Sequence, residues 1–183
     1  MSVDTAGLVL LVVVLVGLAW YLSFTATRLD RLHQRVEGGQ AALDAQLVRR
    51  AAVTAQLATS GLLDPATAVL LADAAAGART VDPGDQAARE AAESTLSRAL
   101  RAALDQPDVL AALAGDPDGA ELLGELTSAC RRVAMARRFH NDAVRAIRVM
   151  RRHRLVRLLR LAGHAPLPRT FEMDDTPPAG LTR

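Results

Sequence analysis

The stretch ELLGELTSACRRVAMARRFHNDAVRAI, from Glu121 to Ile147, repeats apolar residues at the three- and four-residue intervals of an α-helix. Successive positions lie about 100° apart around a helix axis, which brings one set of side chains onto a single stripe. These residues are Leu122, Leu126, Ala129, Val133, Ala136, His140, Val144 and Ile147. The pattern predicts a helix from near Pro117 to about His153 that buries this stripe against another helix. Leu126, Val133 and Val144 should therefore be buried.

The same stripe bears on whether the consecutive residues His140, Asn141 and Asp142 form a catalytic site. His140 falls on the predicted helix seam, and its neighbours one turn away cannot orient it as a base or share a metal with it. Asp142 points the opposite way, between Arg138 and Arg145 at ion-pair spacing. We expect a hydrogen-bonded seam histidine and no catalytic residue. A hydrolase that uses His140 is the alternative.

The composition favours an all-α fold. Of the 183 residues, 50% are hydrophobic but only 3% are aromatic, and the apolar residues are mostly Ala, Leu and Val. Such residues suit close-packed helices better than a sheet. The single cysteine, Cys130, excludes an internal disulfide, and no Cys/His cluster has the spacing of a zinc site. We therefore expect neither a metal nor a cofactor.

An uncharged run, GLVLLVVVLVGLAWYLSF, extends from Gly7 to Phe24. At a helical rise these residues reach roughly 27 Å, close to the thickness of a membrane hydrocarbon core. We predict a transmembrane helix over residues 7–26, after a short extracytoplasmic segment, 1–6. A cleaved signal peptide is the alternative. It is disfavoured because no basic residue precedes the run, and Asp4 is the only charged side chain before it.

The arginines around this run predict its orientation. None precedes it, whereas Arg28, Arg31 and Arg35 follow closely. Because short cytoplasmic flanks are enriched in basic residues, the N-terminus should lie outside and the rest of the chain in the cytoplasm. The sequence thus predicts a single-pass protein of the inner (plasma) membrane.

Three Asp-Pro pairs, at residues 64–65, 82–83 and 116–117, each offer a capping carboxylate and a proline for the first helical position. They divide residues 27–165 into a long helix ending at Thr59, a short Ala-rich helix, a helix from about Asp85 to Leu104 and the last helix. Pro107 should end or kink the third of these. Gly38-Gly39 suggests a bend or a close helix crossing in the first.

The two longest predicted helices are similar in length, which favours an antiparallel pair. The predicted fold is therefore an all-α, antiparallel bundle of three to four long helices behind one transmembrane helix. The tail, residues 166–183, contains Pro177-Pro178, and we expect it to be disordered.

Several motifs follow one another along the chain. They are LDAQLVRR at 43–50, QPDV at 106–109, ARRFHNDAV at 136–144, and AGHAP at 162–166 followed by FE at 171–172. In this order and spacing they resemble the LemA family of bacterial membrane-anchored proteins. The chain would be a divergent member, because Gln40 and His140 stand where the family has a tryptophan and a tyrosine.

The resemblance implies a cytoplasmic bundle on a membrane anchor and no known enzymatic activity. It is consistent with a non-enzymatic interaction or scaffold protein whose specificity and protein partner are unknown. The alternative is a regulatory subunit of a membrane-bound enzyme such as a protease, which is suggested only by what is associated with relatives of the family.

The charges are unevenly distributed. Residues 60–130 carry 4 Arg against 12 Asp and Glu, whereas residues 131–169 carry 12 Arg against Asp142 alone, which gives net charges of −8 and +11. Four arginines recur every seven residues and form the candidate interaction face, called the arginine stripe. They are Arg131, Arg138, Arg145 and Arg152.

The arginine stripe has three interpretations: a solvated face, a contact with an acidic protein surface such as residues 60–130, or a contact with anionic lipid headgroups. The membrane tether and the lack of aromatic stacking residues argue against nucleic acid as a partner. A second basic segment, 154–163, is amphipathic. It can either fold back as the last helix or lie in a membrane interface.

Overall fold

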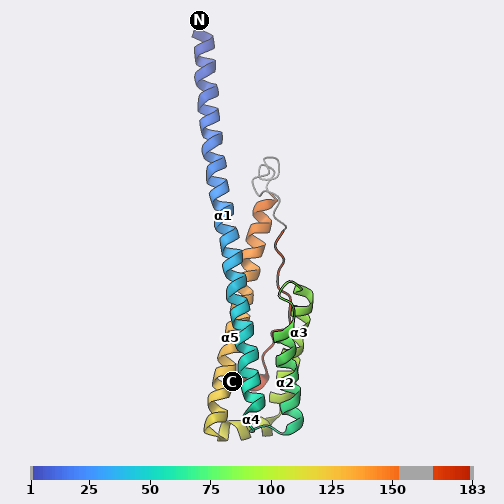
Figure 1. Ribbon diagram of the computed structural model, residues 1–183. Helices are drawn as coiled ribbons and strands as arrows, with labels where there is room; N and C mark the ends of the chain where they lie inside the picture. The colour runs from blue at the N-terminus through green and yellow to red at the C-terminus, as the bar shows by residue number, and fades with distance from the viewer. Residues whose placement is uncertain (1, 153–166, 182–183) are drawn as a thin grey trace. The chain divides into compact units, whose positions relative to one another are not determined.

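The computed structural model describes residues 2–152 and 167–181. Within them the chain forms helices and no β-strand, so the predicted all-α class is confirmed (Figure 1). The elements are α1 (Ser2–Thr59), α2 (Pro65–Thr80), α3 (Gln86–Leu104), α4 (Pro107–Gly115), α5 (Pro117–Arg151) and the short 3-10 helix η1 (Ala179–Leu181). The amphipathic segment 154–163 lies outside the described residues.

The chain divides into two compact units. The first consists of Met1–Gly38 and Asp142–Arg169, and the second of Gly39–Asn141 and Thr170–Arg183. Helices α1 and α5 each contribute residues to both units. The second unit also contains α2, α3, α4 and η1, and it holds most of the buried residues.

Local capping explains where α2 and α5 begin. Asp64 accepts hydrogen bonds from the N–H groups of Ala66 and Thr67 (3.0 and 3.1 Å), and Pro65 begins α2. Asp116 likewise accepts a bond of 3.0 Å from the N–H of Gly119 in the first turn of α5. These two Asp-Pro predictions are confirmed, as is the end of α1 at Thr59.

The remaining prediction, that Asp82 and Pro83 cap and begin a helix, is wrong. Helix α3 begins three residues after Pro83, and its cap is Asp85, whose carboxylate accepts a bond of 3.0 Å from the N–H of Ala88. Asp82 instead accepts a bond from the N–H of Gly84 (2.8 Å), and its carbonyl accepts one from Asp85 (3.0 Å). These bonds close a turn, because proline and glycine suit its two central positions. Pro107 does end the preceding helix and starts α4.

The second unit has a main apolar cluster to which all five α-helices contribute. Leu57 of α1, Leu71 of α2, Leu100 of α3, Leu113 of α4 and Leu126 of α5 are all buried in it. A smaller cluster combines Leu43, Leu47 and Val133 with Phe171 and Met173 of the tail. The predicted burial of Leu126 and Val133 is confirmed, and Val144, in the first unit, is also fully buried.

Helices α1 and α5 approach each other closely within the second unit. A Cβ atom on Gly39 would lie only 3.3 Å from the Cα of His140. The close crossing predicted from the glycine pair is therefore present at Gly39. Gly38 has open space instead.

The tail was expected to be disordered, and this is wrong for residues 167–181. They form an extended segment that ends in η1, with Phe171, Met173 and Leu181 buried (Figure 1). Composition was misleading because the polar groups of the segment bind side chains of the helices rather than water.

In the first unit, α1 includes a section that is long and apolar enough to cross a membrane. Its large apolar side chains are exposed, including Leu10, Val14 and Leu18. Farther along α1, Leu29 and Leu32 pack against Met150 of α5. From Thr5 to Phe24, in contrast, no side chain of α1 is buried.

Candidate interaction site

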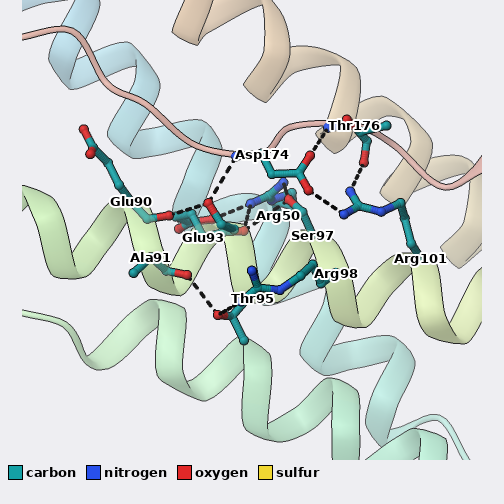
Figure 2. A network of polar contacts seen from close by, with 11 residues as sticks. Arg50, Glu90, Ala91, Glu93, Thr95, Ser97, Arg98, Arg101, Asp174 and Thr176 are labelled. Carbon is teal, nitrogen blue, oxygen red and sulfur yellow. Dashed lines mark hydrogen bonds and ion pairs between the residues drawn. The ribbon is translucent and has the colours of Figure 1, made fainter.

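A buried ion pair lies in the second unit between α1 and α3 (Figure 2). Arg50 is 2% exposed and Glu93 is 4% exposed. Arg50 Nη2 lies 2.5 Å from Glu93 Oε2 and also donates to the Glu93 carbonyl, while Nη1 donates to Ser97 Oγ at 3.0 Å. The charge is thus compensated inside the core, where it cannot reach a ligand.

Burial also shifts the pKa of the Glu93 carboxyl and of the Cys130 thiol. It raises the pKa of the Glu93 carboxyl, and the positive charge of Arg50 opposes that rise. Burial likewise raises the pKa of the Cys130 thiol. Because the thiolate is the nucleophilic form, Cys130 is unsuited to covalent catalysis.

Asn141 of α5 binds the backbone of the tail. Its side-chain Nδ2 donates to the carbonyl of Phe171 at 3.1 Å, and its Oδ1 accepts from the N–H of the same residue at 2.8 Å. Asn141 is buried. The middle residue of the His-Asn-Asp triplet therefore has a specific binding role, which the sequence interpretation missed.

Side chains of α3 bind further backbone groups of the tail. Gln86 donates to the carbonyl of Thr170 at 2.7 Å, and Glu90 accepts from the N–H of Glu172 at 2.9 Å. Ser94 accepts from the N–H of Asp174 at 3.1 Å. The backbone of residues 170–174 is consequently held on both sides, by α3 and by α5.

Two tail side chains insert into the unit. Phe171 and Met173 are buried, while Glu172 between them is exposed, which is the alternation expected of extended chain. The guanidinium carbon of Arg89 lies 5.7 Å from the centre of the Phe171 ring. Phe171 is thus the main apolar anchor of the tail, with a cation over its ring.

Two arginines bind the acidic residues that follow. Arg101 pairs with the Asp174 carboxylate and donates to the carbonyl of Thr176 at 2.8 Å (Figure 2). Arg137 lies 2.9 Å from the Asp175 carboxylate. The hydrogen bond from Arg101 is the main reason why the pKa of Asp174 is lowered to about 2.

We call the surface that holds residues 170–176 the tail site. It comprises apolar residues of α1 and α5, hydrogen-bonding side chains of α3 and α5, and two arginines. The residues are Leu43, Leu47, Gln86, Glu90, Ser94, Arg101, Val133, Arg137 and Asn141.

The arginine stripe is exposed at all four positions. Arg131 and Arg138 belong to the second unit, and Arg145 and Arg152 to the first. Arg145 pairs with Asp142 at 2.8 Å. Within the described part of the chain the other three have no carboxylate within 4.0 Å, so the stripe makes no ion pair with the acidic residues 60–130 there.

His140 is buried, as its seam position predicted. Across residues 2–152 and 167–181 there is no cluster of three or more His, Cys, Asp or Glu side chains that could hold a metal ion. The sequence interpretation identified the exposed arginines. It missed the tail site, whose ligand contacts are mostly to backbone atoms.

Comparison with protein-family models, with curated proteins and with solved structures finds no match. The resemblance to the LemA family therefore stays a prediction from the motifs.

Proposed function

We propose that this protein is a membrane-anchored, non-enzymatic interaction protein whose helical bundle lies in the cytoplasm. The observation that carries the proposal is the contrast within α1. Its apolar side chains from Leu8 to Leu18 are exposed, whereas Leu43, Leu47 and Leu57 are buried. Apolar surface costs about 25 cal/mol per Å² when it is left in water, so the exposed section requires an apolar environment.

Contacts within the second unit support an antiparallel arrangement of α1 and α5. Gly39 approaches His140, Leu43 and Leu47 share a cluster with Val133, and Arg49 lies 3.6 Å from Glu125. Residue numbers thus rise along one helix as they fall along the other. This arrangement agrees with the bundle implied by the LemA resemblance.

The chemistry of the buried polar groups favours interaction over catalysis. Arg50 and Glu93 are bound to each other, the Cys130 thiol is held protonated by burial, and Asn141 is bound to the tail. The exposed arginine stripe and the tail site are surfaces that suit binding. Arg28, Arg31 and Arg35 support the cytoplasmic placement, with the N-terminus outside the inner membrane.

Anchoring and orientation can be tested together. The native cysteine is replaced by alanine, and single cysteines are introduced as Ser2→Cys or Thr182→Cys. We expect both proteins to stay in the membrane pellet after alkaline carbonate extraction. A membrane-impermeant maleimide should label Ser2→Cys in intact cells and Thr182→Cys only after lysis.

Release by carbonate would contradict the anchor, and the reverse labelling would contradict the orientation. Crosslinking in the native membrane then identifies the partner. A stoichiometric membrane enzyme among the products would favour the regulatory-subunit alternative over a scaffold.

A further inference from the structure

The tail site has the features of a surface that recognises peptides. Its side chains form hydrogen bonds with the backbone of Thr170, Phe171, Glu172 and Asp174. Backbone groups are the same in almost every sequence, so these bonds fix the extended conformation and the register rather than the identity of the segment. In many peptide-binding proteins the edge of a β-sheet supplies such backbone hydrogen bonds. Here polar side chains of the helices supply them.

Selectivity would come from the side chains of the bound segment. Phe171 is fully buried beside Leu43, Leu47 and Val133, and Met173 occupies the second apolar position. Arg101 and Arg137 receive the two consecutive carboxylates that follow. The site therefore matches an aromatic residue, an apolar residue two positions later, and two acidic residues directly after it.

We propose that the tail site is a peptide-recognition site, which the protein's own tail occupies and which accepts an extended segment of another protein with this aromatic–x–apolar–acidic–acidic pattern. The inference goes beyond membrane anchoring and does not depend on it. Two features identify the occupant: the bound tail itself, which shows what fits, and the positive charge at the acidic end of the site.

The attached tail acts as a competitor for such a partner. A segment tethered to its own binding site has an effective concentration on the order of millimolar. A free peptide of equal intrinsic affinity therefore binds weakly until the tail is loosened. Regulation would follow from anything that weakens the tail more than the partner.

The test uses the full chain in nanodiscs and a fluorescein-labelled peptide of residues 167–181. Phe171→Ala in the protein removes the apolar anchor of the attached tail and leaves the receiving side chains unchanged. By fluorescence anisotropy, we expect this variant to bind the peptide at least roughly tenfold more tightly than the wild-type protein does. Circular dichroism confirms that the helices are intact.

Three controls examine the site itself. Adding Asn141→Ala to the Phe171→Ala protein should abolish the gained binding, because the backbone of the peptide loses the bond it accepts from Asn141 and the bond it donates to Asn141. A peptide that carries Asp174→Lys and Asp175→Lys should also fail to bind, whereas Glu172→Gln, at an exposed position, should bind as before.

A second variant, Asp174→Asn with Asp175→Asn, weakens binding of the attached tail but keeps its apolar anchor, Phe171. It provides a test in case the Phe171→Ala protein does not fold. If either folded variant binds the peptide, the proposal is supported. If the folded variants do not bind it, or if both variants unfold, the tail is a fixed part of the core and the proposal is overturned. In the wild-type protein, a crosslink between the tail of one copy and the tail site of another would identify a second copy as the occupant. That result would contradict the proposal that the site binds a different protein.

Discussion

The arginine side chain occurs in two opposite environments in this protein: Arg50 is buried, and the arginines of the stripe are exposed. Arg50 lies on the buried face of α1, and its guanidinium contacts Glu93 and Ser97. The stripe arginines are exposed: Arg131, Arg138 and Arg145 lie on α5, and Arg152 directly follows it. Among them Arg145 alone pairs with a described carboxylate, that of Asp142. The position of an arginine relative to the apolar seam therefore decides whether its charge supports the fold or is available to a ligand.

The energetic difference follows from solvation. Removing an ion from water costs several kcal/mol, so a buried arginine is tolerated only with a well-placed partner. An exposed pair such as Arg145–Asp142 contributes about 0–1 kcal/mol. The arginines of the tail site, Arg101 and Arg137, are partly exposed and lie between these extremes.

Breaking the buried pair should have the largest effect. Arg50→Met leaves the Glu93 carboxyl buried without its cation, and we expect the free energy of unfolding to fall by about 3–5 kcal/mol. Arg50→Met combined with Glu93→Leu should recover most of the loss, because apolar side chains of similar volume fill the space. Chemical denaturation of the full chain in detergent measures both. A loss of under about 1 kcal/mol in the single variant would contradict the structural role.

The pH dependence of this variant sharpens the test. Burial raises the pKa of Glu93 in the folded protein above its ordinary value of 4.5, and removal of Arg50 takes away the charge that opposes the rise. Because the pKa of Glu93 is higher in the folded than in the unfolded state, folding takes up a proton at this carboxyl. The stability gained from that proton is lost as the pH rises through the folded-state pKa. The deficit of Arg50→Met should therefore shrink as the pH falls toward 4.5.

Two adjacent residues on α5 provide the next comparison. Asn141→Ala removes both hydrogen bonds to Phe171 and should lower the free energy of unfolding by about 1–3 kcal/mol, because buried backbone groups lose their partner. The matched control is Asp142→Ala, which removes only an exposed ion pair and should change stability by less than about 0.5 kcal/mol. Equal effects of the two substitutions would show that the bonds to the tail contribute little.

The helix positions were predictable because their signals are local. Asp64 and Asp116 cap the helices that follow them, and the seam from Leu126 to Val144 shows in residue spacing alone. The Asp82-Pro83 prediction failed because Gly84 and Asp85 complete a turn that competes with capping. The predicted bounds of α3, about Asp85 to Leu104, are nevertheless confirmed, because Asp85 takes over as the cap.

The two polar sites differ in what the sequence reveals. Arg50 follows Leu43 and Leu47 at seam spacing and precedes Leu57 by seven residues. This spacing is a local signal of burial, but the sequence interpretation used neither that signal nor the partner on α3. Asn141 gave no such signal. Its partner is the backbone of Phe171, 30 residues later in the chain. Because every residue has the same backbone groups, such a partner cannot be inferred from residue types.

The ion pair at the edge of the tail site should respond to acid. Because the pKa of Asp174 is lowered to about 2, the folded state releases its proton more readily than the unfolded chain, whose ordinary value is 3.8. The contribution of Asp174 is thus complete above that value and is lost as the pH falls toward about 2. The amide resonances of Asp174 and Thr176 in an NMR titration should report this.

Arg101→Gln is the informative partner variant for the titration. It removes the main cause of the lowered pKa, so the midpoint should move toward 3.8. An unchanged midpoint would show that the backbone bond from Thr176, rather than Arg101, stabilises the carboxylate.

The arginine stripe should contribute least to stability and most to association. Arg→Gln at all four positions, Arg131, Arg138, Arg145 and Arg152, should leave the circular dichroism spectrum unchanged and alter stability by less than about 1 kcal/mol. If the stripe binds an acidic surface, the same protein in neutral nanodiscs should lose its binding to anionic vesicles or its crosslinked partner. Which of these is lost distinguishes lipid from protein as the ligand.

A change in net charge alone could produce such a loss, and a matched variant separates the two causes. Arg→Gln at four exposed arginines outside the stripe removes the same charge from scattered positions; these are Arg49, Arg79, Arg98 and Arg132. Binding through the stripe should survive in this control and should weaken as salt rises, because exposed charges are screened within about 8 Å at physiological ionic strength. Equal losses in both variants would show that net charge, rather than the seven-residue spacing, attracts the ligand. If both variants bound as well as the wild-type protein, the stripe would be a solvated face. It would then differ from Arg50 only in its exposure to solvent.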